Sequence, residues 1–390
     1  MPAKSPSGWI VLLLAFACGA IVANLYYAQP LVGPIAVELG LPRASAGVIV
    51  TVAQIGYGLG LLLLVPLADL VENRRLIVVT VAGSGVALAA AAMAGQGSVF
   101  LAAALAIGLG SVAAQMLVPF AAHLAPEAVR GRVVGNVMSG LMLGIMLARP
   151  FASFVAEFAS WRWAFAISAA LMAGLAALLR AGLPERRPGT RLSYASLLAS
   201  MAYLVAGTPA LRRRGLYQAC LFGAFSLFWT AAPLHLASPL YGLSQGGIAL
   251  FALAGVAGAV AAPIAGRIAD TGRIRVLSAA AMAIAAAAFG LALALDDGSA
   301  LGLGLLTAAA IVLDFGVSAN LVAGQRVIFG LRPELRSRLN GLYIAMFFAG
   351  GAAGSAVGAW VYAEAGWRAT ALVGLALPLA ALLALATERR

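Results

Sequence analysis

Long apolar runs, separated by short polar segments, account for most of this chain. A helix needs about 20 consecutive apolar residues to cross the hydrocarbon core of a bilayer. The pattern predicts twelve such helices, over 9–35, 45–68, 76–95, 98–122, 133–157, 162–182, 215–237, 245–266, 275–295, 299–326, 341–363 and 369–387. We therefore expect an all-α polytopic membrane protein with six helices in each half of the chain.

The cations lie mainly in every second connection between these runs. One set of connections holds Lys4, Arg74, Arg75, Arg130, Arg132, Arg186, Arg187, Arg191, Arg212, Arg213, Arg214, Arg273, Arg275, Arg332, Arg336, Arg338, Arg389 and Arg390. The other set holds only Arg43, Arg162 and Arg368. Cytoplasmic loops carry an excess of Lys and Arg, so this alternation predicts that both termini are cytoplasmic.

One pattern of residues occurs twice, at a constant separation of 206 residues. The first copy is Arg130, Arg132, Gly135, Gly144, Trp161 and Arg162, and the second is Arg336, Arg338, Gly341, Gly350, Trp367 and Arg368. Each half has an even number of spans, so the halves are parallel repeats related by an axis along the membrane normal. We predict a first bundle over 1–182, a cytoplasmic loop over 183–214, and a second bundle over 215–390. Within the loop, residues 192–205 suit an amphipathic helix on the membrane surface.

Composition excludes several other classes of protein. Hydrophobic residues make up 63% of the chain and charged residues only 10%, which is too little polar surface for a soluble globule. The apolar runs are continuous rather than alternating, which disfavours a transmembrane β-barrel. The net charge of +12 is spread over short loops and is not the footprint of a nucleic-acid-binding protein. Cys18 and Cys220 both lie inside apolar runs and indicate neither a disulfide nor a metal site.

Two loop motifs follow the second and eighth runs. They read Val65-Pro66-Leu67-Ala68-Asp69-Leu70-Val71-Glu72-Asn73-Arg74-Arg75 and Gly266-Arg267-Ile268-Ala269-Asp270-Thr271-Gly272-Arg273. Together with the six-plus-six duplication, they resemble the major facilitator superfamily, whose loop motif is Gly-x-x-x-Asp-(Arg)-x-Gly-Arg-(Arg/Lys). The resemblance covers nearly the whole chain. It implies two pseudo-symmetric six-helix bundles, and a secondary transporter that moves a solute by alternating access.

Several shorter strings are similar to the bacterial arabinose-efflux and drug–proton antiporter-like permeases. They are Asn24-Leu25-Tyr26-Tyr27-Ala28-Gln29-Pro30, Gly56-Tyr57-Gly58, Ala148-Arg149-Pro150 and Arg336-Ser337-Arg338-Leu339-Asn340-Gly341. This resemblance implies proton-coupled efflux of a small organic solute in the bacterial inner membrane. The chain departs from the pattern in two places: residues 98–122 carry no charge, and Arg149 interrupts the antiporter motif of the fifth helix.

Arg149 lies deep in the fifth run, too far from either end for its side chain to reach water easily. A charge at that depth costs about 3 kcal/mol on insertion scales, so it must face protein or a water-filled cavity. We interpret Arg149 as a cation that binds a ligand or gates the central cavity. The alternative is a structural arginine bonded to carbonyl groups that Pro150 leaves free.

Asp314 is the only acid deep inside a run, and it lies midway along the tenth. At 1.5 Å of rise per residue, its height is within roughly 10 Å of Arg149. We hypothesise a conformation-sensitive ion pair between Arg149 and Asp314, which protonation of Asp314 releases. A static buried pair is the alternative.

Helices 1, 4, 7 and 10 line the cavity in the superfamily, and in this chain they carry polar or aromatic residues. The resemblance therefore implies a binding pocket formed by Asn24, Tyr26, Tyr27, Gln29, Gln115, Gln218, Trp229 and Asn320. Amides inside membranes also bridge helices without contacting a solute, which is the alternative for each of them.

A second cluster marks the cytoplasmic ends of the helices. The residues expected to take part in gating are Asp69, Arg74, Arg75, Asp270, Arg273, Arg130 and Arg336. By the family resemblance, they hold the inner gate shut in the outward-open state. The alternative is that they only anchor the topology.

The remaining features narrow the function. His123 and His235 have no partner ligands in the sequence, so we expect no metal site, and no phosphate-binding loop of the Gly-x-x-x-x-Gly-Lys type occurs. We therefore predict a transporter rather than an enzyme, with no cofactor, working as a monomer on a small-molecule substrate and protons. The alternatives are an uptake permease that binds a small anion at Arg149 and, less favoured, a non-transporting membrane sensor.

Overall fold

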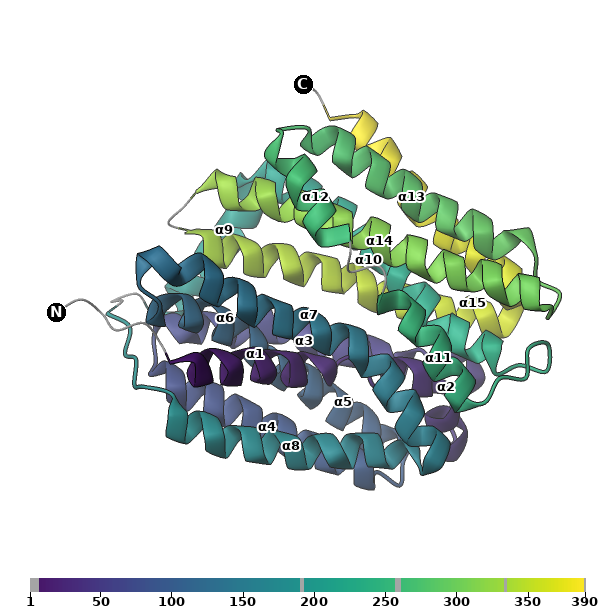
Figure 1. Ribbon diagram of the computed structural model, residues 1–390, viewed down its shortest axis with the longest axis horizontal. Coiled ribbons are helices and arrows are strands. Elements are labelled where there is room, and N and C mark those ends of the chain that lie inside the picture. The colour runs from purple at the N-terminus through teal and green to yellow at the C-terminus, as the bar shows by residue number, and fades with distance from the viewer. Residues whose placement is uncertain (1–6, 190–192, 257–260, 333–334, 389–390) are drawn as a thin grey trace.

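The computed structural model describes residues 7–189, 193–256, 261–332 and 335–388, and these form helices and no strands. Of residues 128, 261–263 and 270 only the backbone is described. The helices are α1 (Gly8–Ala23), α2 (Ala28–Glu38), η1 (Arg43–Ser45), α3 (Val48–Leu63), η2 (Val65–Asp69), α4 (Asn73–Met93), α5 (Gly97–Ser111), α6 (Ala113–Leu124), α7 (Glu127–Phe158), α8 (Trp161–Gly182), α9 (Tyr194–Gly207), α10 (Pro209–Leu236), α11 (Gln245–Ala254), α12 (Ala261–Asp270), α13 (Ile274–Ala294), α14 (Ala300–Leu331) and α15 (Arg336–Ala386). Figure 1 shows them as two groups, the first half of the chain below and the second above.

The helices account for all twelve predicted spans. In the described part of the chain, ten helical segments are long and apolar enough to cross a membrane. The last of these, α15, comprises two predicted spans, because Gly366 bends it with a φ of +74°, a conformation that glycine adopts without strain. The predicted span 245–266 corresponds to α11 and α12. The predicted all-α polytopic fold is therefore confirmed.

The first span is a broken helix. Residues 24–27 form a turn between α1 and α2, with short-range bonds such as Tyr26 N–H to the Ala23 carbonyl at 2.9 Å. Irregular backbone at membrane depth is tolerated where it is buried in protein, and Asn24, Tyr26 and Tyr27 are all buried. The break places the side chains of this turn at the centre of the molecule, where a regular helix would have continued.

Glycine allows the helices of each half to pack closely. A Cβ atom on Gly144 of α7 would overlap the backbone of Gly19 on α1. In the second half, a Cβ atom on Gly350 of α15 would overlap the backbone of Ala219 on α10. Gly144 and Gly350 are partners in the sequence repeat, so the duplication reproduces one close helix pair in each half.

We call the side that holds α9 and the C-terminal Glu388 the terminal side, and the opposite side the far side. Contacts between the two halves are concentrated toward the far side. There α2 packs on α10, α11 packs on α7, and η1 and α3 pack on α15. On the terminal side, α1 and α12 pack chiefly on helices of their own half. In this conformation the halves are therefore closed together on the far side.

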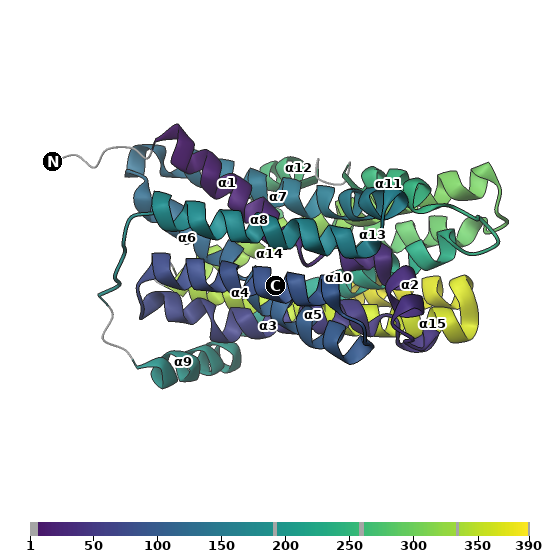
Figure 2. The ribbon, with the colours of Figure 1, turned by 90° about the horizontal axis from the view of Figure 1, so that it is seen from below.

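The predicted amphipathic helix at 192–205 is observed as α9, over Tyr194–Gly207. Leu197, Met201 and Leu204 face the protein and are buried, whereas Tyr203 is exposed. The Tyr194 hydroxyl donates to the carbonyl of Leu63 at 2.8 Å, which ties α9 to the first half. Figure 2 shows α9 at one edge of the bundle, at the same end as the N-terminus.

Candidate substrate site at the centre of the bundle

Arg149 lies in the middle of α7, one residue before Pro150, and only 3% of its surface is exposed. Its Nε donates a hydrogen bond of 2.7 Å to Oε1 of Gln29, which lies just after the broken turn of the first span. Its hydrogen-bond partner is therefore a side chain, and not one of the carbonyl groups near Pro150. This bond joins α7 to the centre of the first span.

Three aromatic rings surround the guanidinium group of Arg149. Its Cζ lies 5.2 Å from the ring centre of Tyr26, 4.8 Å from that of Phe225 and 4.4 Å from that of Trp229. A cation over an aromatic face gains about 2 kcal/mol when both are removed from water. Tyr26 belongs to the first half and the other two rings to α10, so the charge of Arg149 lies at the interface between the halves.

Asp314, on α14, is 8% exposed and accepts a hydrogen bond of 2.9 Å from Nε1 of Trp229. Within the described part of the chain, no atom pair brings Arg149 and Asp314 into an ion pair of 4 Å or less, although their charges interact electrostatically. The direct pair that we hypothesised is thus replaced, in this conformation, by a chain of contacts in which Trp229 bridges the two charges. Its ring lies under Arg149 and its N–H group is bonded to Asp314.

Several hydrogen-bond donors near Arg149 are buried without a partner. They are Nη2 of Arg149 and Nε2 of Gln29, and a third unmet donor, Nδ2 of Asn24, lies in the broken turn, where this side chain bonds to Ser168 of α8. Buried polar groups nearly always have partners, and an unmet donor costs about 1–3 kcal/mol. Since all three are donors, the group that would satisfy them is rich in acceptors.

Most of the other predicted pocket residues bridge helices instead. Gln218 and Asn320 bond to each other at 2.8 Å within the second half, and Gln218 also donates to the Val317 carbonyl. Gln115 donates to the hydroxyl of Tyr57 at 3.0 Å, and Asn24 accepts from Ser168. Of the eight predicted pocket residues, Tyr26, Gln29 and Trp229 surround Arg149 in this structure.

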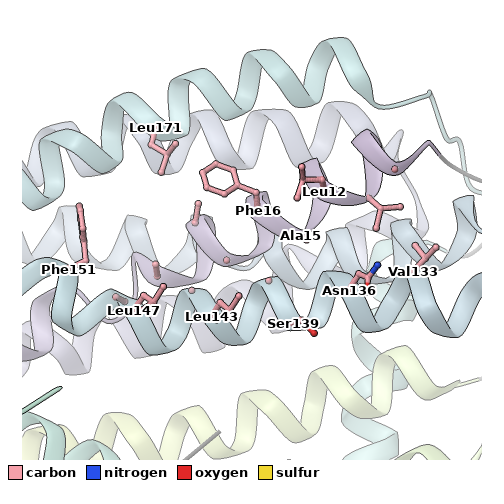
Figure 3. Close-up of a pocket in the computed structure, with 18 of the residues that line it drawn as sticks. Leu12, Ala15, Phe16, Val133, Asn136, Ser139, Leu143, Leu147, Phe151 and Leu171 are labelled. Carbon is pink, nitrogen blue, oxygen red and sulfur yellow. The ribbon is translucent and has the colours of Figure 1, made fainter. Parts of the chain in front are cut away.

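Tyr27 lies against a separate groove of about 1140 Å³ between α1, α7 and α8. Figure 3 shows that apolar side chains such as Leu12, Phe16 and Leu143 follow the groove, with Asn136 and Ser139 near one end. Arg149 does not line this groove, which opens on the outer surface of the first half.

Two residues of the site were missed by sequence reasoning. Phe225 lies four residues before Trp229 and so shares its helix face, a spacing that could have revealed it. Gly255, directly after α11, had no such signal. It leaves room for the site, because a Cβ atom there would lie 2.9 Å from both Oδ2 of Asp314 and Cζ2 of Trp229.

We expect Gly255→Ala to lower the melting temperature of the purified protein. The backbone there has a φ of −59°, which alanine adopts freely, so the effect is steric and of the order of 1–3 kcal/mol. Gly304→Ala on α14 is the control, because a Cβ atom there meets nothing within 4 Å. Equal melting temperatures for the two variants would contradict the close fit at Gly255.

The predicted gating residues do not form one cluster. Asp69 lies 3.8 Å from Nε of Arg338 and so connects the two halves on the terminal side. Arg130 donates to the Ala122 carbonyl and Arg336 to the Phe329 carbonyl, so each caps the end of the preceding helix, α6 or α14.

The other members of this predicted set lie elsewhere. Arg74 pairs with Glu185 at 2.6 Å, within the first half. The side chains of Arg75 and Arg273 make no hydrogen bond or ion pair with the residues that the structure describes. The side chain of Asp270 lies outside the described part of the chain.

On the far side, side-chain hydrogen bonds join the two halves. The hydroxyl groups of Thr51 and Ser355 are 2.8 Å apart, and Oε2 of Glu157 accepts from the N–H group of Gly246 at 2.6 Å. Ser355 stands at the position in the second repeat that corresponds to Arg149 in the first. One repeat therefore supplies the buried charge, and the other supplies a hydroxyl group that closes the far side.

Two groups of helices that are long and apolar enough to span a membrane meet around a buried charged site, which is the architecture of a polytopic membrane protein. The chain matches the sequence profile of the Major Facilitator Superfamily over residues 11–308 and again over 215–390, and it belongs to that superfamily. Among curated proteins it is similar to the uncharacterized transporter YgaY of Escherichia coli O157:H7, with 41% identity over 96% of this chain and 94% of the relative. It is also similar to the probable transporter SCO4007 of Streptomyces coelicolor, with 32% identity over 93% of this chain and 85% of the relative.

Solved structures share the fold. The nucleoside transporter NupG has a TM-score of 0.74, with 16% identity over 97% of this chain and 100% of that chain. The human organic anion transporter MFSD10 has a TM-score of 0.70, with 20% identity over 97% of this chain and 100% of that chain. The predicted superfamily and fold are confirmed, and the family and its relatives' names indicate a transporter, not an enzyme. The narrower drug–proton antiporter branch stays a prediction.

Proposed function

We propose that this protein is a proton-coupled secondary transporter that takes up a small organic carboxylate by alternating access. The observation that carries the proposal is the pair of unmet, buried donors at Arg149 Nη2 and Gln29 Nε2. The 2.7 Å bond between the same two side chains holds these donors next to each other.

A carboxylate is the group that best satisfies these donors. Arginine recognises carboxylates with two N–H groups in a planar fork, and such charge-assisted bonds are about twice as strong as neutral ones. The rings of Tyr26, Phe225 and Trp229 add apolar walls beside the guanidinium group. Of the two transport modes that the sequence leaves open, efflux of an organic solute and uptake of a small anion, this geometry favours the anion.

Asp314 supplies the coupling to protons. Its carboxylate is buried in the membrane with a single hydrogen-bond donor, Trp229, and the titratable groups within its electrostatic range in the described structure are Arg149 and Tyr26. An anion at Arg149 is repelled by an ionised Asp314 and not by a neutral one. By thermodynamic reciprocity, a bound proton raises the affinity for the anion, and a bound anion raises the affinity for the proton by the same factor. This linkage is the one that a symporter requires.

The transport cycle needs the two halves to move, because the site is sealed. Arg149, Gln29 and Trp229 are all nearly inaccessible, and the far side is closed by contacts such as Thr51–Ser355. Rocking of the halves would break the far-side contacts and strengthen those on the terminal side, where Asp69 and Arg338 stand 3.8 Å apart. With the terminal side in the cytoplasm, as the distribution of Arg predicts, an inward proton gradient across the bacterial inner membrane drives uptake.

The test is a ligand screen followed by flux. Purified protein is tested by thermal shift with benzoate, hexanoate, benzamide and benzylamine, and binders are then followed in proteoliposomes with and without a pH gradient. We expect the carboxylates to stabilise the protein and the neutral amide and the amine not to. Accumulation should follow the direction of the proton gradient and stop when a protonophore collapses it.

Two results would overturn the proposal. Stabilisation by benzylamine alone would indicate a cation site at Asp314, and a cation that competes with the proton there would fit efflux by antiport. If no binder showed gradient-driven flux, the assignment as a proton-coupled transporter would have to be withdrawn.

A further inference from the structure

A second polar site lies far from Arg149, at the terminal ends of α4 and α8. It is a hollow of about 990 Å³, and its lining is Leu70, Glu72, Arg74, Arg75, Val78, Val79, Arg180, Glu185, Arg187 and Pro188. Figure 1 shows that α4 and α8 form the edge of the first half that is farthest from the second half. The hollow therefore belongs to the membrane-facing periphery and not to the transport pathway.

The acids of this hollow are already engaged. Glu185 pairs with Arg74 at 2.6 Å. Glu72 accepts hydrogen bonds from the backbone N–H groups of Arg74 and Arg75, at the start of α4, and from that of Arg186. Burial alone would raise the pKa of Glu72, but these three bonds outweigh it and hold the pKa below its ordinary value, so Glu72 stays ionised at neutral pH.

Three of the arginine side chains are not engaged. Those of Arg75, Arg180 and Arg187 make no hydrogen bond or ion pair with any residue in the described ranges, yet all three line the same hollow. They come from the first turn of α4, the last turn of α8 and the loop that follows α8. Four arginines and two glutamates line the hollow, so its net charge is positive, and three of its arginine side chains have no partner among the described residues. This arrangement suits a ligand with a phosphate group.

The surroundings indicate that this ligand also has apolar chains. Val79 lines the hollow and is 61% exposed, and along the same helix Val86 is 72% and Met93 82% exposed. Leu178 on α8 is exposed as well. These side chains form an apolar surface that begins at the arginines and runs across the membrane. Arginines at the ends of the spans lie at the level of lipid headgroups.

We propose that this hollow binds the phosphate headgroup of an anionic phospholipid, with the acyl chains lying along α4 and α8. The three arginines contact the phosphate, and the exposed valines and leucine contact the chains. The loop at Arg187 is fixed to α4, because the N–H group of Asn73 donates to the Arg186 carbonyl at 2.9 Å. A bound lipid therefore joins two helices and the start of the central loop.

The experiment measures lipid binding by native mass spectrometry of the full-length protein titrated with phosphatidylglycerol, cardiolipin or phosphatidylcholine. The test variant is Arg75→Gln/Arg180→Gln/Arg187→Gln. The control, Arg132→Gln/Arg267→Gln/Arg332→Gln, removes the same charge from other exposed positions that we expect on the same membrane face. At about 1 kcal/mol for each arginine, we expect the test variant to bind cardiolipin about 100-fold more weakly and the control to change little.

Three outcomes would overturn the proposal: no loss of cardiolipin binding in the test variant, an equal loss in the control, or equal binding of phosphatidylcholine by the wild type. A parallel titration with inorganic phosphate separates the two sources of the same chemistry, and competition at millimolar phosphate would indicate a site for the free ion. If the triple variant does not fold, Arg187→Gln alone, in the loop, is expected to show a smaller loss of the same kind. None of these measurements depends on the transport proposal.

Discussion

Replacing Arg149 by glutamine is expected to weaken binding of benzoate, or of whichever carboxylate the screen identifies, by about 100-fold, because removal of one partner of a buried charge-assisted contact costs roughly 2–5 kcal/mol. The glutamine side chain would keep a polar group at the site but would lack the positive charge and the planar fork of donors. Binding is measured by isothermal titration on the folded fraction, and uptake by proteoliposome flux.

The Lys variant and a control on the same helix sharpen this result. Arg149→Lys keeps the charge but cannot present two parallel donors, so we expect an intermediate loss of affinity. Arg132→Gln, at an exposed position of α7, should bind as the wild type does. If Arg149→Gln lowered only the melting temperature, with full affinity in the folded fraction, Arg149 would be a structural residue.

Replacing Asp314 by asparagine is expected to remove the pH dependence of binding and to uncouple transport from protons. In the wild type, affinity for the anion should rise as the pH falls, because protonation of Asp314 removes the negative charge near Arg149. The carboxylate solute itself stays ionised as long as the pH is well above its own pKa, which is close to 4. Asparagine resembles the protonated acid, so the variant should bind tightly at every pH and exchange solute across the membrane, but it should not accumulate solute under a pH gradient.

Asp297→Asn is the control, because this acid lies in the loop between α13 and α14, where it accepts a hydrogen bond from the N–H group of Ser299. It should leave the pH profile unchanged. If Asp314→Asn kept both gradient-driven accumulation and the wild-type pH profile, Asp314 would have no role in coupling. If the variant instead bound the anion more weakly at high pH than the wild type, in which Asp314 is then ionised, the sign of the proposed linkage would be wrong.

The two variants together separate the roles of the two charges. Under the proposal, the proton affects transport only through its effect on anion binding. An Arg149 variant that no longer binds the anion therefore cannot show proton-coupled transport. A variant that binds without coupling, as expected for Asp314→Asn, is possible. Trp229 lies between the two charges and contacts both, so it is the residue through which a change at one can move the other.

The positions of the spans could be read from the sequence because each depends on local composition. Twelve apolar runs and the repeat at 206 residues were enough to predict the order of the spans, and the helices that form the spans begin and end within about six residues of their runs. Arg149 and Asp314 could also be singled out, because a charge inside an apolar run is costly and therefore conspicuous.

The contacts of the polar side chains could not be read in this way. Five amide side chains lie inside apolar runs and look alike in the sequence: Asn24, Gln29, Gln115, Gln218 and Asn320. Gln29 bonds to Arg149, whereas the other four bond to side chains outside the site. Hydrophobic periodicity marks a residue as buried, but it does not indicate which helix lies opposite. The helix break at residues 24–27 turns Tyr26 toward Arg149. The sequence does not predict this break, because the apolar run continues through it.

By itself, the sequence determined that this protein is a duplicated set of membrane-spanning helices, with Arg149 and Asp314 as charges deep inside its apolar runs. The burial of apolar surface and the cost of a charge in lipid each depend on the residues of a single segment. Both effects can therefore be inferred from the order of apolar and charged residues along the chain. Only the tertiary structure decided that Trp229 stands between Arg149 and Asp314, that Gly255 makes room for them, and that donors of Arg149 and Gln29 remain unmet. These features depend on helices far apart in the sequence meeting at particular angles, which the packing of the whole bundle sets.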